Sequence, residues 1–375
     1  MRIIPSGLRE HSSSIAAPVT GAATVVLVLA LLAQSGLGSG TMASATRPAS
    51  APLTPLNWTN LHLAGGPGPR AEFGFTWVNA SGQSYGLLFG GRPSWNALFN
   101  DTWMFVNGTW HLLHLAVHPS ARRGLMMTYD PIDGYVVLFG GSNSTSYLND
   151  TWAFSRGAWV QLHPSVSPPA RRVGGFTYDA SDGYVLLFSG HNGSSLSSNH
   201  GFTVIDDTWA FVQGSWTKLH PKAQPPGRDE SSMAYDPIVG QVVLFGGYYS
   251  APHYHSFKDT WVFHAGVWKR LLLAVSPSQR DGAATVYDPA LQGVLIEGGQ
   301  NESGNVSTLD LNDTWVLVGN SVANLSWVHI STPHALAPND GATAVFDTAT
   351  GKVVLFGGRT AVPKPTWYGK TWELS

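Results

Sequence analysis

The chain has 375 residues, with 21 lysines and arginines against 23 aspartates and glutamates, and its formal net charge is −2. This near-neutral balance excludes the basic surface that binding to nucleic acid requires. The absence of cysteine excludes disulfides, thiolate metal sites, cysteine nucleophiles and iron–sulfur clusters. With 42 glycines and 15 tryptophans, the composition favours short strands joined by tight turns.

The amino terminus has the pattern of a targeting segment. Arg2 and Arg9 precede an uncharged stretch over residues 15–37, which ends in small residues. A basic leader, an apolar middle and a small-residue exit predict a secretory signal peptide over residues 1–37. The stretch of about 23 residues is also long enough for an uncleaved anchor, so cleavage and a membrane tether through 15–37 both stay open. We expect the remainder outside the cell or at its surface, after a disordered linker over 38–55.

From residue 56 onward the chain is built from a repeat of about fifty residues. Residues 122–163 show the unit: an arginine, an Asp-Pro-x-x-Gly turn between two apolar runs, a Gly-Gly pair, an Asp-Thr-Trp element and a second tryptophan. The apolar element with its glycine pair recurs, twice in degraded form, at 88–91, 138–141, 187–190, 244–247, 296–299 and 355–358. The Asp-Thr-Trp element recurs at 101–103, 150–152, 207–209, 259–261 and 313–315, and as Lys370-Thr371-Trp372. The domain over 56–375 therefore holds six units.

Each unit contains four short apolar runs, which predict four antiparallel strands. Tight turns separate the first run from the second and the third from the fourth, as in hairpins. The sixth unit has no second tryptophan after Trp372, and Asn57-Trp58-Thr59-Asn60-Leu61-His62 supplies the matching sequence near the other end. We therefore expect residues 57–62 to pair beside 371–374 and to complete the sixth sheet.

Four-stranded units with a diglycine and paired aromatic residues resemble kelch repeats, and the resemblance covers residues 57–375. It implies an all-β fold: a six-bladed β-propeller of four-stranded antiparallel blades, closed by the N-terminal strand joining the C-terminal blade. The physical logic agrees, because a four-stranded sheet buries both faces only by stacking on its neighbours around an axis. The resemblance implies no single function, since kelch propellers serve many roles.

By the same resemblance, the loops between the second and third strands lie on one face with the connections between blades. These loops carry aromatic residues outside the repeat pattern, and such residues on loops over a rigid ring are typical of binding surfaces. We expect them to contact a protein or a cell-surface glycan. The candidate residues are Trp95, Tyr147, Phe202, Tyr248, Tyr254 and Trp367, with Phe99, Tyr249, Phe257 and Tyr368 in the same loops.

An arginine recurs seven residues before the aromatic residue of the first strand, at Arg70, Arg122, Arg171, Arg228 and Arg280, with Asn339 in the sixth unit. Because the first strand is innermost in a propeller, these arginines are candidates for an anion site at the channel mouth. An arginine here is also typical of kelch repeats whatever their ligand, which favours a hydrogen-bonding role between blades. The next position differs between units, as Arg123, Arg172, Asp229, Asp281 and Asp340, and it is the better candidate for specificity.

Metal and enzyme chemistry find little support in the sequence. His253 and His255 are weak candidates for zinc or copper ligands, because nothing supplies a third ligand, and we expect no metal or cofactor. Galactose oxidase-like enzymes use a kelch propeller, but their copper site needs a tyrosine cross-linked to cysteine. A six-bladed kelch enzyme that interconverts sialic acid anomers is a second precedent, for which Glu230 and channel arginines or aspartates are acid–base candidates.

The sequence thus predicts an exported binding module that contacts a protein or a carbohydrate through its long-loop face. Two alternatives stay open. One is a sugar-acting enzyme, either an isomerase or mutarotase or a hydrolase, with its site at the channel mouth. The other is a structural component of the cell envelope.

Overall fold

The computed structural model describes residues 56–80, 82–193, 202–249, 255–301, 309–333, 336–360 and 364–375. The chain divides into Met1–Ala51 and Pro52–Ser375. The predicted signal segment and the predicted linker lie outside the described residues, as do His253 and Tyr254. Within the part that is described, no helix has the length and apolar character needed to cross a bilayer.

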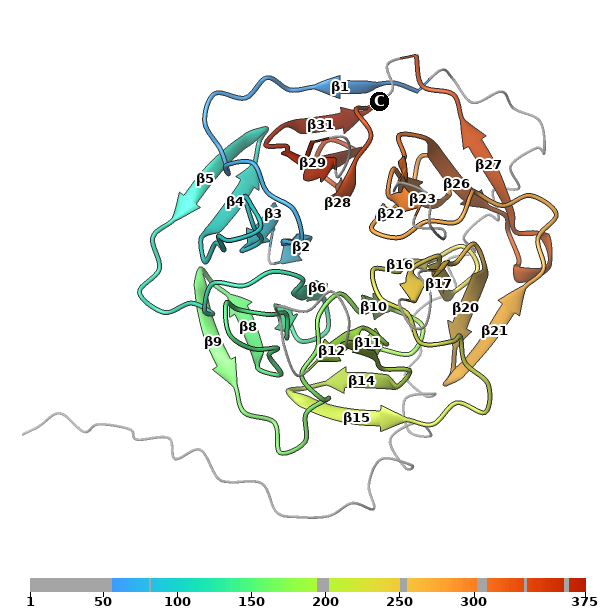
Figure 1. Ribbon diagram of the computed structural model, residues 1–375, viewed down its shortest axis with the longest axis horizontal. Helices are drawn as coiled ribbons and strands as arrows, with labels where there is room; N and C mark the ends of the chain where they lie inside the picture. The colour runs from blue at the N-terminus through green and yellow to red at the C-terminus, as the bar shows by residue number, and fades with distance from the viewer. Residues whose placement is uncertain are drawn as a thin grey trace, which may run out of the picture. The chain divides into compact units, whose positions relative to one another are not determined.

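Six four-stranded antiparallel sheets are arranged as blades around a common axis (Figure 1). The first three blades are β2 (Gly74–Ala80), β3 (Gln83–Phe89), β4 (Thr102–Val106) and β5 (Thr109–Leu113); β6 (Met126–Asp130), β7 (Tyr135–Phe139), β8 (Thr151–Ser155) and β9 (Ala158–Leu162); and β10 (Gly175–Asp179), β11 (Tyr184–Phe188), β14 (Thr208–Val212) and β15 (Ser215–Leu219). The last three are β16 (Ser232–Asp236), β17 (Gln241–Phe245), β20 (Thr260–His264) and β21 (Val267–Leu271); β22 (Ala284–Asp288), β23 (Gly293–Glu297), β26 (Thr314–Val318) and β27 (Ser326–Ile330); and β28 (Asp340–Asp347), β29 (Lys352–Thr360), β31 (Thr371–Leu374) and β1 (Trp58–Asn60). The predicted fold of six four-stranded blades is confirmed.

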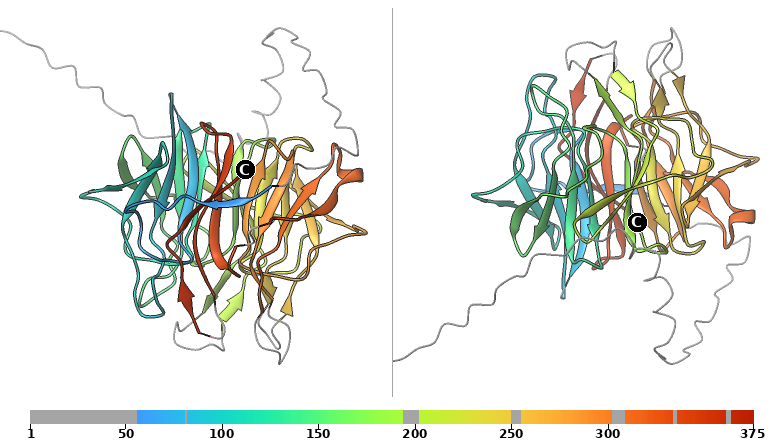
Figure 2. Two further views of the ribbon diagram at one scale, coloured as in Figure 1. Left: turned by 90° about the horizontal axis from the view of Figure 1, so that it is seen from above. Right: turned by 90° about the horizontal axis from the view of Figure 1, so that it is seen from below.

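Short strands extend the loops between the second and third strands of several blades. They are β12 (His191–Gly193) with β13 (Phe202–Val204), β18 (Tyr248–Tyr249) with β19 (His255–Ser256), β24 (Gln300–Asn301) with β25 (Leu309–Asp310), and β30 (Thr366–Trp367) on β29. A 3₁₀ turn, η2 (Val322–Asn324), precedes β27. These short strands stand out from one face of the propeller (Figure 2). We call this face the long-loop face.

Burial within a blade follows the order of its strands. In the second strand β7, all residues from Val136 to Phe139 are buried, whereas the outer strand β9 buries Trp159 between exposed neighbours. Central strands are covered on both faces and outer strands on one, which explains the two patterns. At the tight turn before β7, the Asp130 Oδ1 atom accepts a hydrogen bond from the N–H of Ile132 at 2.9 Å, as expected of a turn-forming aspartate.

The sixth blade contains both ends of the propeller domain. β1 lies antiparallel to β31, with Trp58 opposite Leu374 and Asn60 opposite Trp372. The N–H of Asn57 also donates to the carbonyl of Ser375 at 3.0 Å. Because β1 completes this sheet, β31 is not left as an open edge.

The tryptophan of each outer strand ties its blade to the preceding one. Its Nε1–H donates to the threonine hydroxyl of the Asp-Thr-Trp position one blade earlier, at 2.9–3.2 Å. The six pairs are Trp110–Thr371, Trp159–Thr102, Trp216–Thr151, Trp268–Thr208, Trp327–Thr260 and Trp58–Thr314. The same interaction therefore occurs at all six junctions between blades. The buried indoles also supply the apolar contact between sheets.

A second ring, made of backbone hydrogen bonds, surrounds the axis. Its members lie two residues after the repeated arginine position, and each N–H donates to the carbonyl of the equivalent residue in the preceding blade at 2.8–3.3 Å. We call these residues the axial ring: Glu72, Gly124, Val173, Glu230, Gly282 and Gly341. All six have φ between 50° and 67°, a conformation that glycine adopts most easily. Residues on the long-loop side of the axial ring form one space, and residues on the opposite side of the ring form another.

Candidate functional site

On the long-loop side of the axial ring, each blade brings two residues towards the axis. In the sequence, one directly precedes the residue of the axial ring and the other directly follows the Gly-Gly position. The two are paired through their backbones, as Arg172 is with His191 and Asp340 with Arg359. Their titratable members and the two acidic residues of the axial ring form a group that we call the axial cup. The axial cup consists of Glu72, Arg92, Arg123, Arg172, His191, Asp229, Glu230, Asp281, Asp340 and Arg359.

Three arginines converge on Glu72. Arg92 forms an ion pair with its Oε1 atom, while the Nη1 atoms of Arg123 and Arg172 lie 3.3 and 3.7 Å from Oε2. Burial by itself favours the neutral acid, but the arginines outweigh it and hold the pKa of Glu72 well below its ordinary value. Glu72 is therefore an ionised centre that holds these guanidinium groups in place.

His191 connects this basic cluster to Asp229. Burial, aided by the charge of Arg172, lowers the pKa of His191 well below its usual value, so its ring is neutral. The Nε–H of Arg172 donates to Nε2 of His191 at 2.8 Å, which leaves the ring proton on Nδ1. That Nδ1 atom lies 2.5 Å from Oδ2 of Asp229. The contacts thus define the tautomer of His191.

The opposite side of the axial cup is acidic. Carboxylate oxygens of Glu230, Asp281 and Asp340 all lie within 4.8 Å of one another. Nε and Nη2 of Arg359 contact Oδ2 of Asp340 at 3.0 and 2.9 Å, and Ser256 donates to Asp281 at 2.9 Å. Burial first, and then the neighbouring carboxylates, raise the pKa of Glu230 well above its ordinary value. Arg359 therefore offsets part of the repulsion in this cluster.

These three carboxylates are also the group of described residues that could hold a metal ion. Oxygen donors of this kind suit Ca²⁺ or Mg²⁺. Arg359 already pairs with one of them, so a cation would compete with an existing partner. Of the predicted histidine pair, His255 is exposed in β19 beside Phe257, with ring centroids 5.2 Å apart, and His253 lies outside the described residues.

The loop aromatics Trp95 and Trp367 border the arginines of the axial cup. The Trp95 ring lies 4.1 Å from the guanidinium carbon of Arg92 and 4.7 Å from that of Arg359. Trp95 meets Trp367 edge to face, with ring centroids 5.8 Å apart. Although it makes these contacts, Trp95 remains 54% exposed. Its indole is available to a ligand placed over the axis.

The remaining aromatic candidates divide between the cup and the loops beyond it. The Tyr147 ring lies edge-on to His191, with centroids 5.7 Å apart. Tyr248 is half-buried and bridged to Asp229. Phe202 is a residue of β13, and Tyr254 lies outside the described residues. The structure therefore brings Trp95, Tyr147, Tyr248 and Trp367 to one place.

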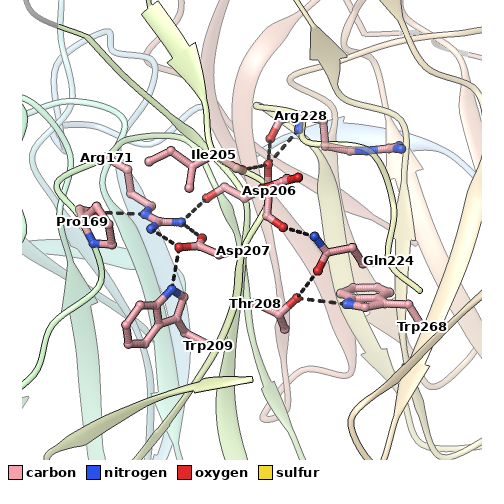
Figure 3. A network of polar contacts seen from close by, with 11 residues as sticks. Pro169, Arg171, Ile205, Asp206, Asp207, Thr208, Trp209, Gln224, Arg228 and Trp268 are labelled. Carbon is pink, nitrogen blue, oxygen red and sulfur yellow. Dashed lines mark hydrogen bonds and ion pairs between the residues drawn. The ribbon is translucent and has the colours of Figure 1, made fainter. Parts of the chain in front are cut away.

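The repeated arginines lie in the wall of the propeller and not in the axial cup. Arg70, Arg228 and Arg280 are at most 1% exposed. Each binds the aspartate of its own Asp-Thr-Trp element, and that aspartate also accepts a hydrogen bond from the tryptophan two residues later. Figure 3 shows this network in the third blade, where Asp207 accepts from Arg171 and from Nε1 of Trp209. The side chains of these arginines therefore form hydrogen bonds within a blade, whereas the sequence favoured bonds between blades.

Sequence reasoning did not single out Arg92, His191 or Arg359. All three directly follow a Gly-Gly or Ser-Gly pair, a position that reads Arg92, Ser142, His191, Tyr248, Gln300 and Arg359 across the six units. Variation at a fixed place in an otherwise regular repeat was the available signal. The aromatic residues of the loops that begin there are a stronger pattern and conceal it.

Six stacked antiparallel blades with a charged cup on their axis define a β-propeller. The family model of the KLHDC2/KLHL20/DRC7 Kelch-repeats domain matches residues 51–214. The match ends at the turn between β14 and β15, and the blades that follow repeat the same arginine, glycine and Asp-Thr-Trp elements. Residues 51–214 thus match a kelch-repeat domain, and all six blades together form one β-propeller. No curated protein matches the chain.

Proposed function

We propose that this protein is an exported binding module that holds a protein partner over the axial cup. The observation that carries the proposal is the partial exposure of two arginines of the axial cup. The side chains of Arg123 and Arg172 are 17% and 16% exposed, whereas the wall arginines are buried. Kelch-repeat propellers generally mediate protein binding, and export rests on the basic leader and the apolar stretch over 15–37.

The arginine side of the axial cup suits an acidic side chain of the partner. Three guanidinium groups surround the single ionised carboxylate of Glu72. Burial raises the pKa values of Asp229 and Glu230, which disfavours the charged form of both groups. A carboxylate from the partner would gain charge-assisted hydrogen bonds from donors that are already held in place.

The test is binding of the purified chain to an array of short acidic, basic and neutral peptides. We expect selective capture of acidic peptides, weakened by salt and lost in the double variant Arg123→Glu/Arg172→Glu. Lys269→Glu is the matched control, because it reverses a charge on the exposed outer strand β21. Equal binding of acidic and neutral peptides, or retention of acidic peptides by the double variant, would contradict the proposal.

A sugar-acting enzyme at the axial cup is the second candidate. It is favoured by the opposite pKa shifts of two carboxyl groups, lowered for Glu72 and raised for Glu230, because such pairs divide the base and acid roles in catalysis. Turnover of sugars that disappears in Glu230→Gln, with peptide binding unchanged, would favour this candidate. A glycan array with Trp95→Ala tests a carbohydrate partner, which the exposed indole favours.

A further inference from the structure

On the other side of the axial ring, the channel between the six innermost strands forms an open cavity of about 630 Å³. Its lining comes from β2, β6, β10, β16, β22 and β28 (Figure 1) and begins one residue after the axial ring. No aspartate, glutamate, lysine, arginine or histidine is among its lining residues within the described part of the chain. This cavity is therefore neutral, in contrast to the axial cup.

The wall of the cavity is nevertheless polar. Each of the six innermost strands is the edge strand of its sheet, so the backbone N–H and C=O groups on its free side have no neighbouring strand. Thr128 and Thr177 also line the cavity and are half-buried. No hydrogen bond among the described residues uses either of their hydroxyl groups. The wall thus offers both donors and acceptors without a net charge.

One aromatic residue from each blade surrounds the tight-turn end of the cavity. All six are half-buried and line it: Trp77, Tyr129, Tyr178, Tyr235, Tyr287 and Phe346. Several are held by their polar tips, since Tyr129 donates to the carbonyl of Asn79 at 2.9 Å, and the Tyr235 hydroxyl lies 2.8 Å from Ser181 Oγ. The rings therefore have defined positions, and their apolar surface borders the entrance.

These properties restrict the chemistry of a ligand. A charged ligand would lose its hydration with no opposite charge to replace it. A purely apolar ligand would cover the free polar groups of six edge strands and leave them unsatisfied. A neutral polyhydroxylated ligand satisfies both requirements, because its hydroxyls pair with the wall and its C–H faces pack on the aromatic rings. The volume lies in the usual range for small-molecule pockets.

We propose that this axial cavity binds a neutral mono- or disaccharide, which enters from the tight-turn face of the propeller. The site is separate from the axial cup, since no cup residue lines the cavity. The proposed sugar site opens on the tight-turn face, whereas the protein partner is proposed to bind on the long-loop face. The two sites can therefore be tested independently on the same chain.

The experiment is calorimetric and saturation-transfer NMR titration of the purified chain with glucose, galactose, mannose, N-acetylglucosamine, cellobiose, maltose and lactose. Glucuronic acid and glucosamine serve as charged probes of the same size. We expect saturable binding of at least one neutral sugar and none of the charged ones. The isosteric double variant Thr128→Val/Thr177→Val should weaken this binding about tenfold, because it removes two hydrogen-bonding groups, and Thr177→Trp should abolish it by filling the cavity.

Two controls locate the sugar. Thr217→Val removes an equivalent hydroxyl from the exposed outer strand β15, and it should leave sugar affinity unchanged. Arg123→Glu/Arg172→Glu should also leave it unchanged while it abolishes capture of acidic peptides. The proposal is overturned if no neutral sugar in the panel binds, if charged sugars bind equally, or if binding survives Thr177→Trp. Loss of sugar binding in the double arginine variant would place the sugar in the axial cup and would likewise overturn it.

Discussion

The indole Nε1–H of Trp58 donates a hydrogen bond of 3.2 Å to the Thr314 hydroxyl, 256 positions later in the chain. The same hydroxyl donates to Oε2 of Glu297. In other blades a phenylalanine packs on the indole at this place, as Phe139 does on Trp216 with centroids 4.9 Å apart. Between the fifth and sixth blades, a buried carboxyl therefore takes the place of the aromatic ring.

Trp58 should contribute strongly to the stability of the whole propeller. Its side chain is 2% exposed and packs in the core between the fifth and sixth blades. We expect Trp58→Ala to lower the free energy of unfolding by about 3–5 kcal/mol, measured by chemical denaturation. Trp95→Ala is the matched control, because Trp95 is 54% exposed, and its cost should be much smaller. Equal losses in the two variants would show that β1 does not stabilise the domain.

Glu297 should make stability depend on pH. Burial raises its pKa to about 7, so the folded state holds a proton that the unfolded state releases near pH 4.5. The free energy of unfolding should therefore fall as pH rises from about 4.5 to 7. Glu297→Gln removes this fall, and the variant should exceed the parent by about 3 kcal/mol above pH 7. Below pH 4 the two should coincide, and a gap that does not change with pH would contradict this assignment.

The buried Arg171–Asp207 pair should tolerate the loss of one partner poorly. Arg171 is fully buried and Asp207 is 8% exposed, so Asp207→Asn leaves a buried positive charge and should cost about 3–5 kcal/mol. Glu373→Gln, at the partly exposed Lys352 pair, should cost at most about 1 kcal/mol. Equal costs in denaturant melts would argue against a structural role for the wall arginines.

The same pair predicts the response to acid. Burial alone would raise the pKa of Asp207, but hydrogen bonds from Arg171 and the charge of Arg171 lower it. The stabilisation is therefore complete above the unfolded value near 4 and is lost as pH falls through the lower folded value. Asp207→Asn should flatten this acid limb of the stability curve. If the free energy of unfolding falls equally steeply with acid in this variant, other carboxyl groups cause the fall.

The first glycine of the Gly-Gly pair is required for space as well as for conformation. Gly246 has a φ of 64°, and a Cβ atom there would lie 2.4 Å from the Arg280 carbonyl oxygen, whereas Gly266 has a φ of 75° and open space. Gly266→Ala should cost about 1–2 kcal/mol and Gly246→Ala about 2–5 kcal/mol in thermal unfolding. Equal costs would mean that the backbone moves away from the added methyl group.

The third blade has a serine in place of this glycine. Ser189 occupies the first glycine position with a φ of 61°, and its hydroxyl donates to the Arg228 carbonyl at 2.6 Å. We therefore expect Gly246→Ser to recover part of the stability that Gly246→Ala loses. A serine variant less stable than the alanine variant would contradict this explanation.

Much of this architecture was predictable from the sequence, because its interactions repeat at a constant spacing. Arg280 binds Asp313 within one blade, and Trp327 binds Thr260 of the blade before. Because such contacts recur at a constant spacing, the sequence predicted the number of blades. It also favoured a hydrogen-bonding role for the repeated arginines, but between blades and not within one. The sixth unit departs from the repeat at two matched places, where Asn339 and Lys370 replace the arginine and the aspartate.

The axial cup and the neutral cavity became visible only in the tertiary structure. Glu72 and Arg172 belong to different blades and meet because each blade turns towards the axis at a residue with left-handed backbone conformation. The residue types at these positions differ from unit to unit, so the repeat marks the positions as variable but does not say which side chains meet. Their charge states depend on burial and on distances across the axis, which arise only when six sheets close into one ring. The sequence by itself determined the repeating blade, and the closure of the blades around an axis decided which unlike residues share a site.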